Sequence, residues 1–285
     1  MEATPKQPAP PLQIWVIAGE AYRVWLQNIG PWLKLLAVPV AVIAAGTILS
    51  LQIMNSMMQG PVQAPSALSV VAVFVFNVLI YLSQIPLATA WHWLILKTDD
   101  PGSHRYMIVG RPEGRYLLKI LFVALVVIAV SLLIGLLLSV LVLSALMEVS
   151  VGGMPNLLLL GLVSTAISLG VYAVLGFFLG YLLLMLPAAA IGRNYAGSEA
   201  SAAIKGNEWR LLGVYVVAML PLIMQKKFLL YWFIGGLALK SGILVAIVQY
   251  GPTLLFAPVV IGVLSITYRE LVQKQKPEAV GEAPA

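Results

Sequence analysis

Long apolar stretches without charge dominate the sequence. No Asp, Glu, Lys or Arg occurs between Lys34 and Lys97, and Glu148 is the single charge between Lys119 and Arg193. A water-soluble domain could not solvate the exposed faces of such stretches, whereas about 20 apolar residues suffice for a helix to cross the hydrocarbon core of a bilayer. The pattern therefore predicts an all-α, polytopic membrane helical bundle.

Apolar runs between charges and turn signals predict six transmembrane helices. Asn55 and Ser56 are expected to end the first helix, and Pro86 and Pro187 to bend the second and the fourth. The fifth run is short for a full crossing, so a re-entrant element is the alternative there, and residues 228–239 after it are predicted to be interfacial. The six runs cover about Leu35–Met54, Ala67–Leu96, Tyr116–Met147, Leu157–Ile191, Leu211–Met224 and Ile243–Tyr268.

Composition supports the same class. Of the 285 residues, 61% are hydrophobic and 10% are charged, whereas soluble domains carry about 25% charged residues. We expect one membrane domain over residues 12–271, with disordered termini at 1–11 and 272–285, and the proline-rich start does not resemble a signal peptide. The chain has no cysteine and only two histidines, so no metal or other cofactor is predicted.

Basic residues predict the orientation in the membrane. If the N-terminus is cytoplasmic, only Lys226, Lys227 and Lys240 of the 17 Lys and Arg residues fall in outer loops. An excess of basic residues in short cytoplasmic loops is the positive-inside rule, so both termini are predicted to be cytoplasmic. This distribution accounts for the net charge of +6, and no nucleic-acid partner is expected.

A similar pattern precedes the first, third and fifth predicted helices. Each time, a break rich in Gly, Asn or Pro is followed by an aromatic residue near a basic one and then by an apolar run; the aromatic residues are Trp32, Tyr116 and Trp209. This recurrence predicts three parallel two-helix repeats. The alternative is that any loop leaving a membrane carries aromatic and basic residues.

Two segments before these breaks have an amphipathic pattern. Polar side chains recur on one side from Gln13 to Gln27 and again from Ser198 to Lys205. Both segments are predicted to be helices lying in the cytoplasmic interface. In the second, Ser198 is the expected N-cap and Glu199 suits the first turn.

The junction between the fourth and fifth predicted helices resembles a known family. It reads Leu-Leu-Met-Leu-Pro-Ala-Ala-Ala over residues 183–190, then Ser198-Glu199-Ala200 and Gly-Asn-Glu-Trp-Arg-Leu over residues 206–211. This is similar to a widespread group of bacterial six-span membrane proteins that includes the membrane domain attached to some glycerophosphodiester phosphodiesterases. The resemblance implies a bacterial inner-membrane protein. It implies no activity, because the metal-binding carboxylate and histidine motifs of the soluble phosphodiesterase domain have no counterpart here.

Polar residues inside the predicted helices are few. Asn77, Gln84 and Gln249 are the outliers, and their amides suit either hydrogen bonding between helices or the lining of a polar cavity. Ion-coupled transport usually requires a charged group at mid-depth, and no carboxylate, lysine or arginine is expected there.

Two further patterns have ordinary structural explanations. Gly176 and Gly180 form a GxxxG pattern, which permits close helix approach and which we expect to pack within the monomer rather than in a dimer. The loop containing Asp99, Asp100 and His104 combines paired carboxylates with a histidine. A divalent-metal or phosphate site is one interpretation, but Asp before Pro-Gly favours an Asx turn.

These observations predict a non-enzymatic protein that organises the membrane or interacts with lipid. Arg111, Arg115 and Arg210 are the candidate contacts for anionic lipid headgroups, because they flank helices at the cytoplasmic side. The alternative is a permease or a membrane subunit of a transporter, with the three amides at its polar site. Membrane lipids are the expected partners, and the alternative partner is an unidentified membrane protein.

Overall fold

The computed structural model describes residues 11–59, 67–96, 110–149, 170–171, 173–174, 176–221 and 242–273, and every element in these ranges is helical. Residues 176–179 and 208–221 are helical as well. The remaining elements are α1 (Ile14–Gln27), α2 (Ile29–Gln59), α3 (Ala67–Leu96), α4 (Arg111–Val149), the 3₁₀ helix η1 (Gly180–Leu184), α6 (Met185–Ala190), α7 (Gly197–Ile204), α9 (Gly242–Tyr268) and the π-helical turn η2 (Arg269–Gln273).

Four helices are long and apolar enough to cross a membrane. They correspond to Ile29–Leu49, Val71–Leu96, Arg111–Leu136 and Tyr250–Gln273, which confirms the first, second, third and sixth predicted runs as candidate spans. The fourth and fifth runs fall partly outside the described residues. Their described parts are the apolar helix Gly176–Ala190 and the helical residues 208–221, so six spans stay a prediction.

The α2 and α4 helices extend beyond their predicted bounds. The α2 helix passes Asn55 and continues to Gln59, whereas α3 begins and ends where predicted. The α4 helix begins at Arg111, five residues early, because the Glu113 carboxylate accepts a hydrogen bond of 2.8 Å from the Gly110 N–H. When a glutamate side chain accepts from the N–H of the residue just before a helix, it pairs an N–H group that the helix backbone leaves unpaired.

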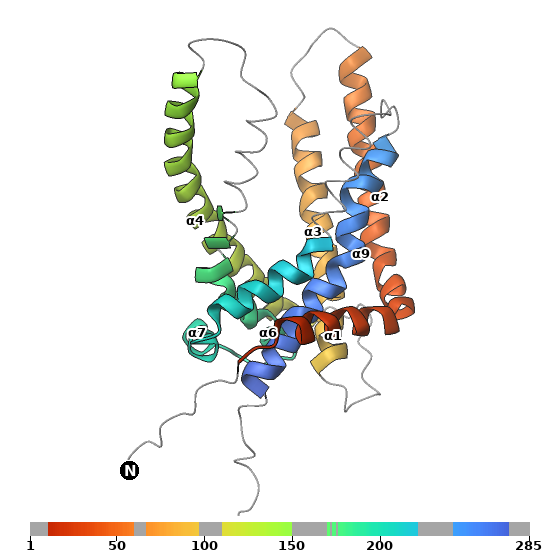
Figure 1. Cartoon of the computed structure of the whole chain (residues 1–285). Coiled ribbons are helices and arrows are strands. Elements are labelled where there is room, and N and C mark those ends of the chain that lie inside the picture. The colour runs from red at the N-terminus through yellow and green to blue at the C-terminus, as the bar shows by residue number, and fades with distance from the viewer. Residues whose placement is uncertain are drawn as a thin grey trace, which may run out of the picture.

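The starts of α2 and α4, the ends of α3 and α9, and the short helices α1, α6 and α7 lie together at one end of the molecule, the base, and α4 diverges from the other long helices above it (Figure 1). In Figure 1, α2, α3 and α9 run side by side, α1 lies across their lower end, and α4 rises on the other side. The α2, α3 and α9 helices contact one another, whereas α4 contacts α6 and α3. The base therefore contains the meeting point of all the described long helices.

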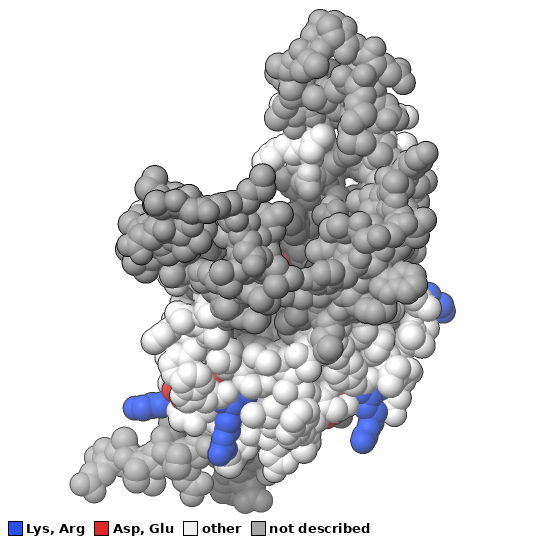
Figure 2. Space-filling view, turned by 45° about the horizontal axis from the view of Figure 1, so that its top comes forward, with Lys and Arg blue, Asp and Glu red and all other residues white. Residues whose placement is uncertain are grey.

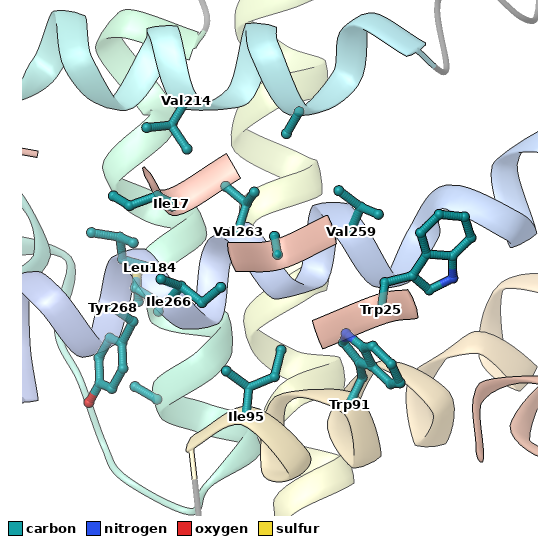
Figure 3. Packing of buried hydrophobic residues seen from close by; sticks show 14 of the residues in the cluster. Ile17, Trp25, Trp91, Ile95, Leu184, Val214, Val259, Val263, Ile266 and Tyr268 are labelled. Carbon is teal, nitrogen blue, oxygen red and sulfur yellow. The ribbon is translucent and has the colours of Figure 1, made fainter. Parts of the chain in front are cut away.

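The α1 helix is part of the core as well as of the surface. Figure 3 shows Ile17 lying between Val214 of the segment 208–221 and Val263 of α9. The Tyr22 hydroxyl donates to the Ala218 carbonyl at 3.1 Å, which ties α1 to that segment. The helix predicted from the amphipathic pattern is thus confirmed, and its apolar face packs against protein.

A proline in α9 leaves one backbone carbonyl of that helix without its usual donor, and a buried tryptophan bonds to this carbonyl. Pro258 has no N–H, so it cannot bond the carbonyl of Leu254 four residues earlier. The Trp32 indole Nε1 donates to that carbonyl at 3.2 Å, and the Trp32 ring meets Trp91 of α3 edge-on with centroids 5.1 Å apart. Trp32 is completely buried, and it joins α2, α3 and α9 at one point.

The GxxxG glycines pack inside the monomer, as predicted. A Cβ at Gly176 would lie 2.8 Å from the Leu212 side chain, and one at Gly180 would lie 3.5 Å from both Leu211 and Tyr215. Both glycines therefore let the helix that contains them approach residues 208–221. The 3₁₀ helix η1 changes to α6 just before Pro187, which was the predicted bend point.

The three breaks share backbone geometry but not the surroundings of their aromatic residues. The carbonyls of Asn28, Gly110 and Asn207 each accept a hydrogen bond from the N–H four residues later, at 2.8–3.1 Å. Trp32 and Tyr116 are buried, whereas Trp209 is 71% exposed. The three-fold repeat stays a prediction, because its aromatic positions are not equivalent in packing.

The predicted disordered termini lie almost entirely outside the described residues. Pro11 is described at one end, and η2 carries the helical structure on to Gln273 at the other. The segment 228–239 and the Asp99–His104 loop also lie outside the described residues.

Candidate functional site

Basic side chains gather at the packed base. The α2 and α4 helices begin there and α3 and α9 end there (Figure 1). The Lys and Arg side chains visible in Figure 2 project around the lower half of the view. The described basic residues are Arg23, Lys34, Arg111, Arg115, Lys119, Arg193, Lys205, Arg210 and Arg269. All of them belong to the side predicted to be cytoplasmic, and the three bases of the predicted outer loops lie outside the described residues.

The three arginines proposed as lipid contacts have different environments. Arg111 and Arg115 lie one turn apart at the start of α4, and Arg210 lies on the segment 208–221; all three are exposed. Arg210 follows the exposed Trp209, whose ring lies 4.5 Å from that of Phe177. The structure thus places Arg111 and Arg115 on one helix and Arg210 on another.

Arg115 has a structural partner. The α6 helix ends in a turn in which Gly192 has a φ of +79°, a left-handed conformation that favours glycine. The N–H groups of Gly192 and Arg193 donate back to the Ala189 and Ala188 carbonyls at 3.0 and 2.9 Å. Arg115 Nη1 then donates to the Gly192 carbonyl at 2.7 Å. Arg115 therefore fixes α4 to the end of α6, a role that the sequence pattern did not reveal.

The three amide residues predicted to pack between helices or to line a polar cavity are described only in part. Asn77 is exposed on α3, and its Nδ2 donates to the Val73 carbonyl of the same helix at 2.8 Å. Gln84 is half-buried on α3. The side chain of Gln249 lies outside the described residues. Within the described part of the chain, Asn77 thus bonds to its own helix.

A buried polar contact between α3 and α9 escaped the sequence analysis. His92 Nδ1 and Ser265 Oγ lie 2.7 Å apart, and both side chains are fully buried. Ser265 Oγ also lies 3.0 Å from the Ile261 carbonyl. The hydroxyl has one proton for these two contacts, so the His92 tautomer decides whether His92 Nδ1 or Ser265 Oγ is the donor between them.

This geometry is that of a contact between helices. Whichever atom donates, the His92–Ser265 pair joins α3 to α9. The His92 Nε2 has no hydrogen-bond partner within the described part of the chain. A lone histidine within an apolar run was the available signal, since ionisable residues inside a membrane helix mark polar contacts or functional sites.

A second buried polar contact lies beside the first turn of α4. Thr89 Oγ1 of α3 lies 3.0 Å from the Pro86 carbonyl of its own helix and 3.5 Å from Glu113 Oε1, and both Thr89 and Glu113 are buried. The other oxygen of Glu113 accepts from Gly110, as described above. A carboxylate at a helix N-terminus is stabilised by the helix dipole, so Glu113 caps α4 at the point where this helix lies beside Thr89 of α3. Among the described residues, no group of three or more His, Cys, Asp or Glu side chains could hold a metal ion.

The loop between α6 and α7 contains a tyrosine with a shifted titration. Burial, with smaller contributions from the nearby Tyr268 and Glu199, raises the pKa of Tyr195 to about 12. Its hydroxyl donates to the Glu199 carbonyl at 3.2 Å. Glu199 lies in the first turn of α7, as predicted, but Ser198 does not precede the helix. The residue before it is Ala196, whose N–H donates to Glu199 Oε2 at 3.2 Å.

No protein-family model, curated protein or solved structure matches this chain. Functional conclusions therefore depend on the residues and the geometry described above.

Proposed function

We propose that this chain is a non-enzymatic, multi-pass protein of the bacterial inner membrane that associates with anionic lipid at a cytoplasmic base. It has six spans and both termini in the cytoplasm. The four candidate spans and the uncharged runs support insertion in a membrane. The resemblance of residues 183–211 to bacterial six-span proteins supports the inner membrane.

The gathering of basic residues at one end of the helices carries the proposal. Each Lys or Arg near an anionic membrane surface contributes about 1 kcal/mol of attraction. Two tryptophans of the base are strongly exposed, Trp15 at 76% and Trp209 at 71%. Tryptophan prefers the headgroup layer, so the base is suited to lie at the membrane surface.

Reporter fusions test the orientation. Fusions after Gln63, Gly153 and Lys240 should report an external location, and fusions after Gly102 and Gly206 an internal one. Two or more reversed reporters would contradict the topology.

Substitution of two exposed arginines tests the lipid association. Arg111→Gln with Arg210→Gln should lower the ratio of anionic to zwitterionic phospholipid that copurifies with the protein. Arg115 is left unchanged because it holds the end of α6. The matched control replaces the same two residues by Lys, which keeps both charges and should keep the ratio. An unchanged ratio in a correctly oriented Gln variant would refute the proposed function.

The permease alternative has less support from the described residues. Asn77 is exposed and bonds to the Val73 carbonyl of its own helix, and it does not line the pocket at the base. Proton-driven solute uptake by the purified protein in liposomes would nevertheless establish transport and replace the lipid proposal.

A further inference from the structure

A pocket lies at the base between α4 and the last part of the fourth predicted run, with the start of α7 at its edge. Its volume is about 520 Å³, within the range of about 300–1,000 Å³ that small-molecule sites occupy. Leu118 and Phe122 of α4 form one wall, and Tyr181, Leu182 and Met185 of η1 and α6 form the other. Most of the lining is therefore apolar.

The polar part of the pocket is confined to its edge. Lys119 is the one charged residue among the described residues that line it, and Gly197 and Ser198 of α7 complete the lining. Lys119 Nζ donates to the Tyr195 carbonyl at 3.5 Å, which holds the ammonium group beside the loop between α6 and α7. This long contact uses one of the three donors of the ammonium group, so the side chain can also bond an anionic oxygen.

The apolar wall continues along α4 away from the base. Leu118 is 68% exposed, and Leu125 and Leu132, two and four turns further along the same side, are 67% and 69% exposed. Positions 118, 122, 125 and 132 share one helix face because they differ by whole turns. An extended hydrocarbon chain that enters the pocket can thus continue along this face.

We propose that the pocket binds one anionic phospholipid. Its phosphate pairs with Lys119, and an acyl chain lies between Leu118 and Phe122 on one side and Tyr181 and Met185 on the other. The proposal rests on the proposed function, since it requires the base to lie at the headgroup layer. It goes further by assigning one open pocket with one basic residue as the binding site, where the exposed arginines provide only general surface attraction.

Photolabelling of the full chain tests the site. The protein is reconstituted in phosphatidylcholine vesicles with a trace of phosphatidylglycerol that carries a diazirine in its acyl chain, and the labelled peptides are identified by mass spectrometry. Label should concentrate on residues 118–122 and 181–185. A phosphatidylcholine probe with the same acyl chain should label them less, because it has no net charge to pair with Lys119.

Substitutions at the edge of the pocket provide the controls. Lys119→Met should lower labelling by phosphatidylglycerol about five-fold, the equivalent of about one lysine at an anionic surface. Lys119→Arg should retain it, and Ser198→Trp should lower it by filling the pocket from an exposed position. Lys34→Met removes a lysine of the base that does not line the pocket and should have no effect. Equal labelling by both probes, or no loss with Lys119→Met, would overturn the site.

The two proposals fail in different ways. If Arg111→Gln with Arg210→Gln lowers total anionic lipid but Lys119→Met leaves pocket labelling unchanged, only the pocket is refuted. If total anionic lipid is insensitive to the two arginines while labelling still depends on Lys119, only the general lipid association is refuted. Displacement of the probe by excess inorganic phosphate would assign a free-phosphate site and overturn the phospholipid.

Discussion

The α9 and α4 helices differ in how much of their apolar surface is covered by other parts of the protein. Half of the α9 span is buried inside the protein, whereas only 6% of the α4 span is buried. Yet α4 has the highest mean hydropathy of the four candidate spans and α9 the lowest. In water the most apolar helix would be the most buried. The inverse order is the one expected when lipid covers the most apolar helix and packing between helices depends on other features.

Those features are small residues and specific polar contacts. Gly262 brings α9 close to α1, because a Cβ there would lie 3.4 Å from the Ala21 Cβ. The α9 helix also accepts the Trp32 indole and bonds His92 through Ser265. Lipid tails are as apolar as leucine, so helices in a membrane associate through close backbone approach and hydrogen bonds. The described face of α4 beyond its first turns consists mainly of exposed leucines.

Removal of Trp32 should give the largest loss of stability. Trp32→Ala leaves a cavity beside Trp91 and an unpaired Leu254 carbonyl, and should cost about 3–5 kcal/mol. Trp209→Ala removes the same side chain from an exposed position and should change stability by less than about 0.5 kcal/mol. Thermal unfolding in detergent measures both. Similar losses in the two variants would contradict the distinction between a packed and an exposed tryptophan.

A charge on the exposed face of α4 tests whether lipid covers it. Leu125→Lys should make membrane insertion less favourable by up to about 3 kcal/mol, and a translocon-based insertion assay measures the effect. The control is Leu26→Lys on the exposed side of α1, where the side chain reaches the interface and the expected cost is small. Normal insertion of the Leu125→Lys variant would show that this face meets water or polar groups.

A matched pair of glycines gives a smaller effect. Gly262→Leu forces new atoms against Ala21 and Ile95 and should cost about 1–3 kcal/mol. Gly135→Leu on α4, where no atom lies within 4 Å of the added Cβ, should be neutral or slightly stabilising. Unfolding midpoints in the same detergent compare the two. A penalty at Gly135 as large as that at Gly262 would show that another segment packs on α4.

The smallest effect concerns the ion pair between α1 and the end of α9. Arg269 Nη2 lies 2.7 Å from Glu20 Oε1, and both side chains are partly exposed. Solvent screens such pairs, so Glu20→Gln should cost at most about 1 kcal/mol. A double-mutant cycle with Arg269→Gln isolates the coupling. A coupling well above that limit would place the pair in a drier setting than its exposure indicates.

Sequence patterns predicted the elements that depend on residues close together in the chain. The α3 bounds, the four long apolar helices and the amphipathic α1 follow from runs, turns and periodicity within one segment. The GxxxG contact was also predicted, because small residues at that spacing have one common use.

Features set by distant partners could not be predicted. Arg115 bonds the carbonyl of Gly192, 77 residues away, and His92 pairs with Ser265, 173 residues away. No local pattern marks either partner. The predicted N-cap at Ser198 was wrong because Glu199 satisfies the N–H of Ala196, which moves the helix start. Asn77 is predicted to bond across helices or to line a cavity, and the structure adds a bond to the Val73 carbonyl of its own helix.

The bond between Trp32 and the Leu254 carbonyl joins residues 222 positions apart, and this distance constrains biogenesis. A ribosome makes chains from the N-terminus, so α1 and α2 exist long before their acceptor helix. Until α9 enters the bilayer, the inner face of α1 and the Trp32 indole have to be covered by lipid, water or a chaperone. The packing of α1 and α2 against α9 is therefore a late step of assembly. A nascent chain arrested before α9 would contain inserted helices without the core that joins them, which makes it a natural target for membrane quality control.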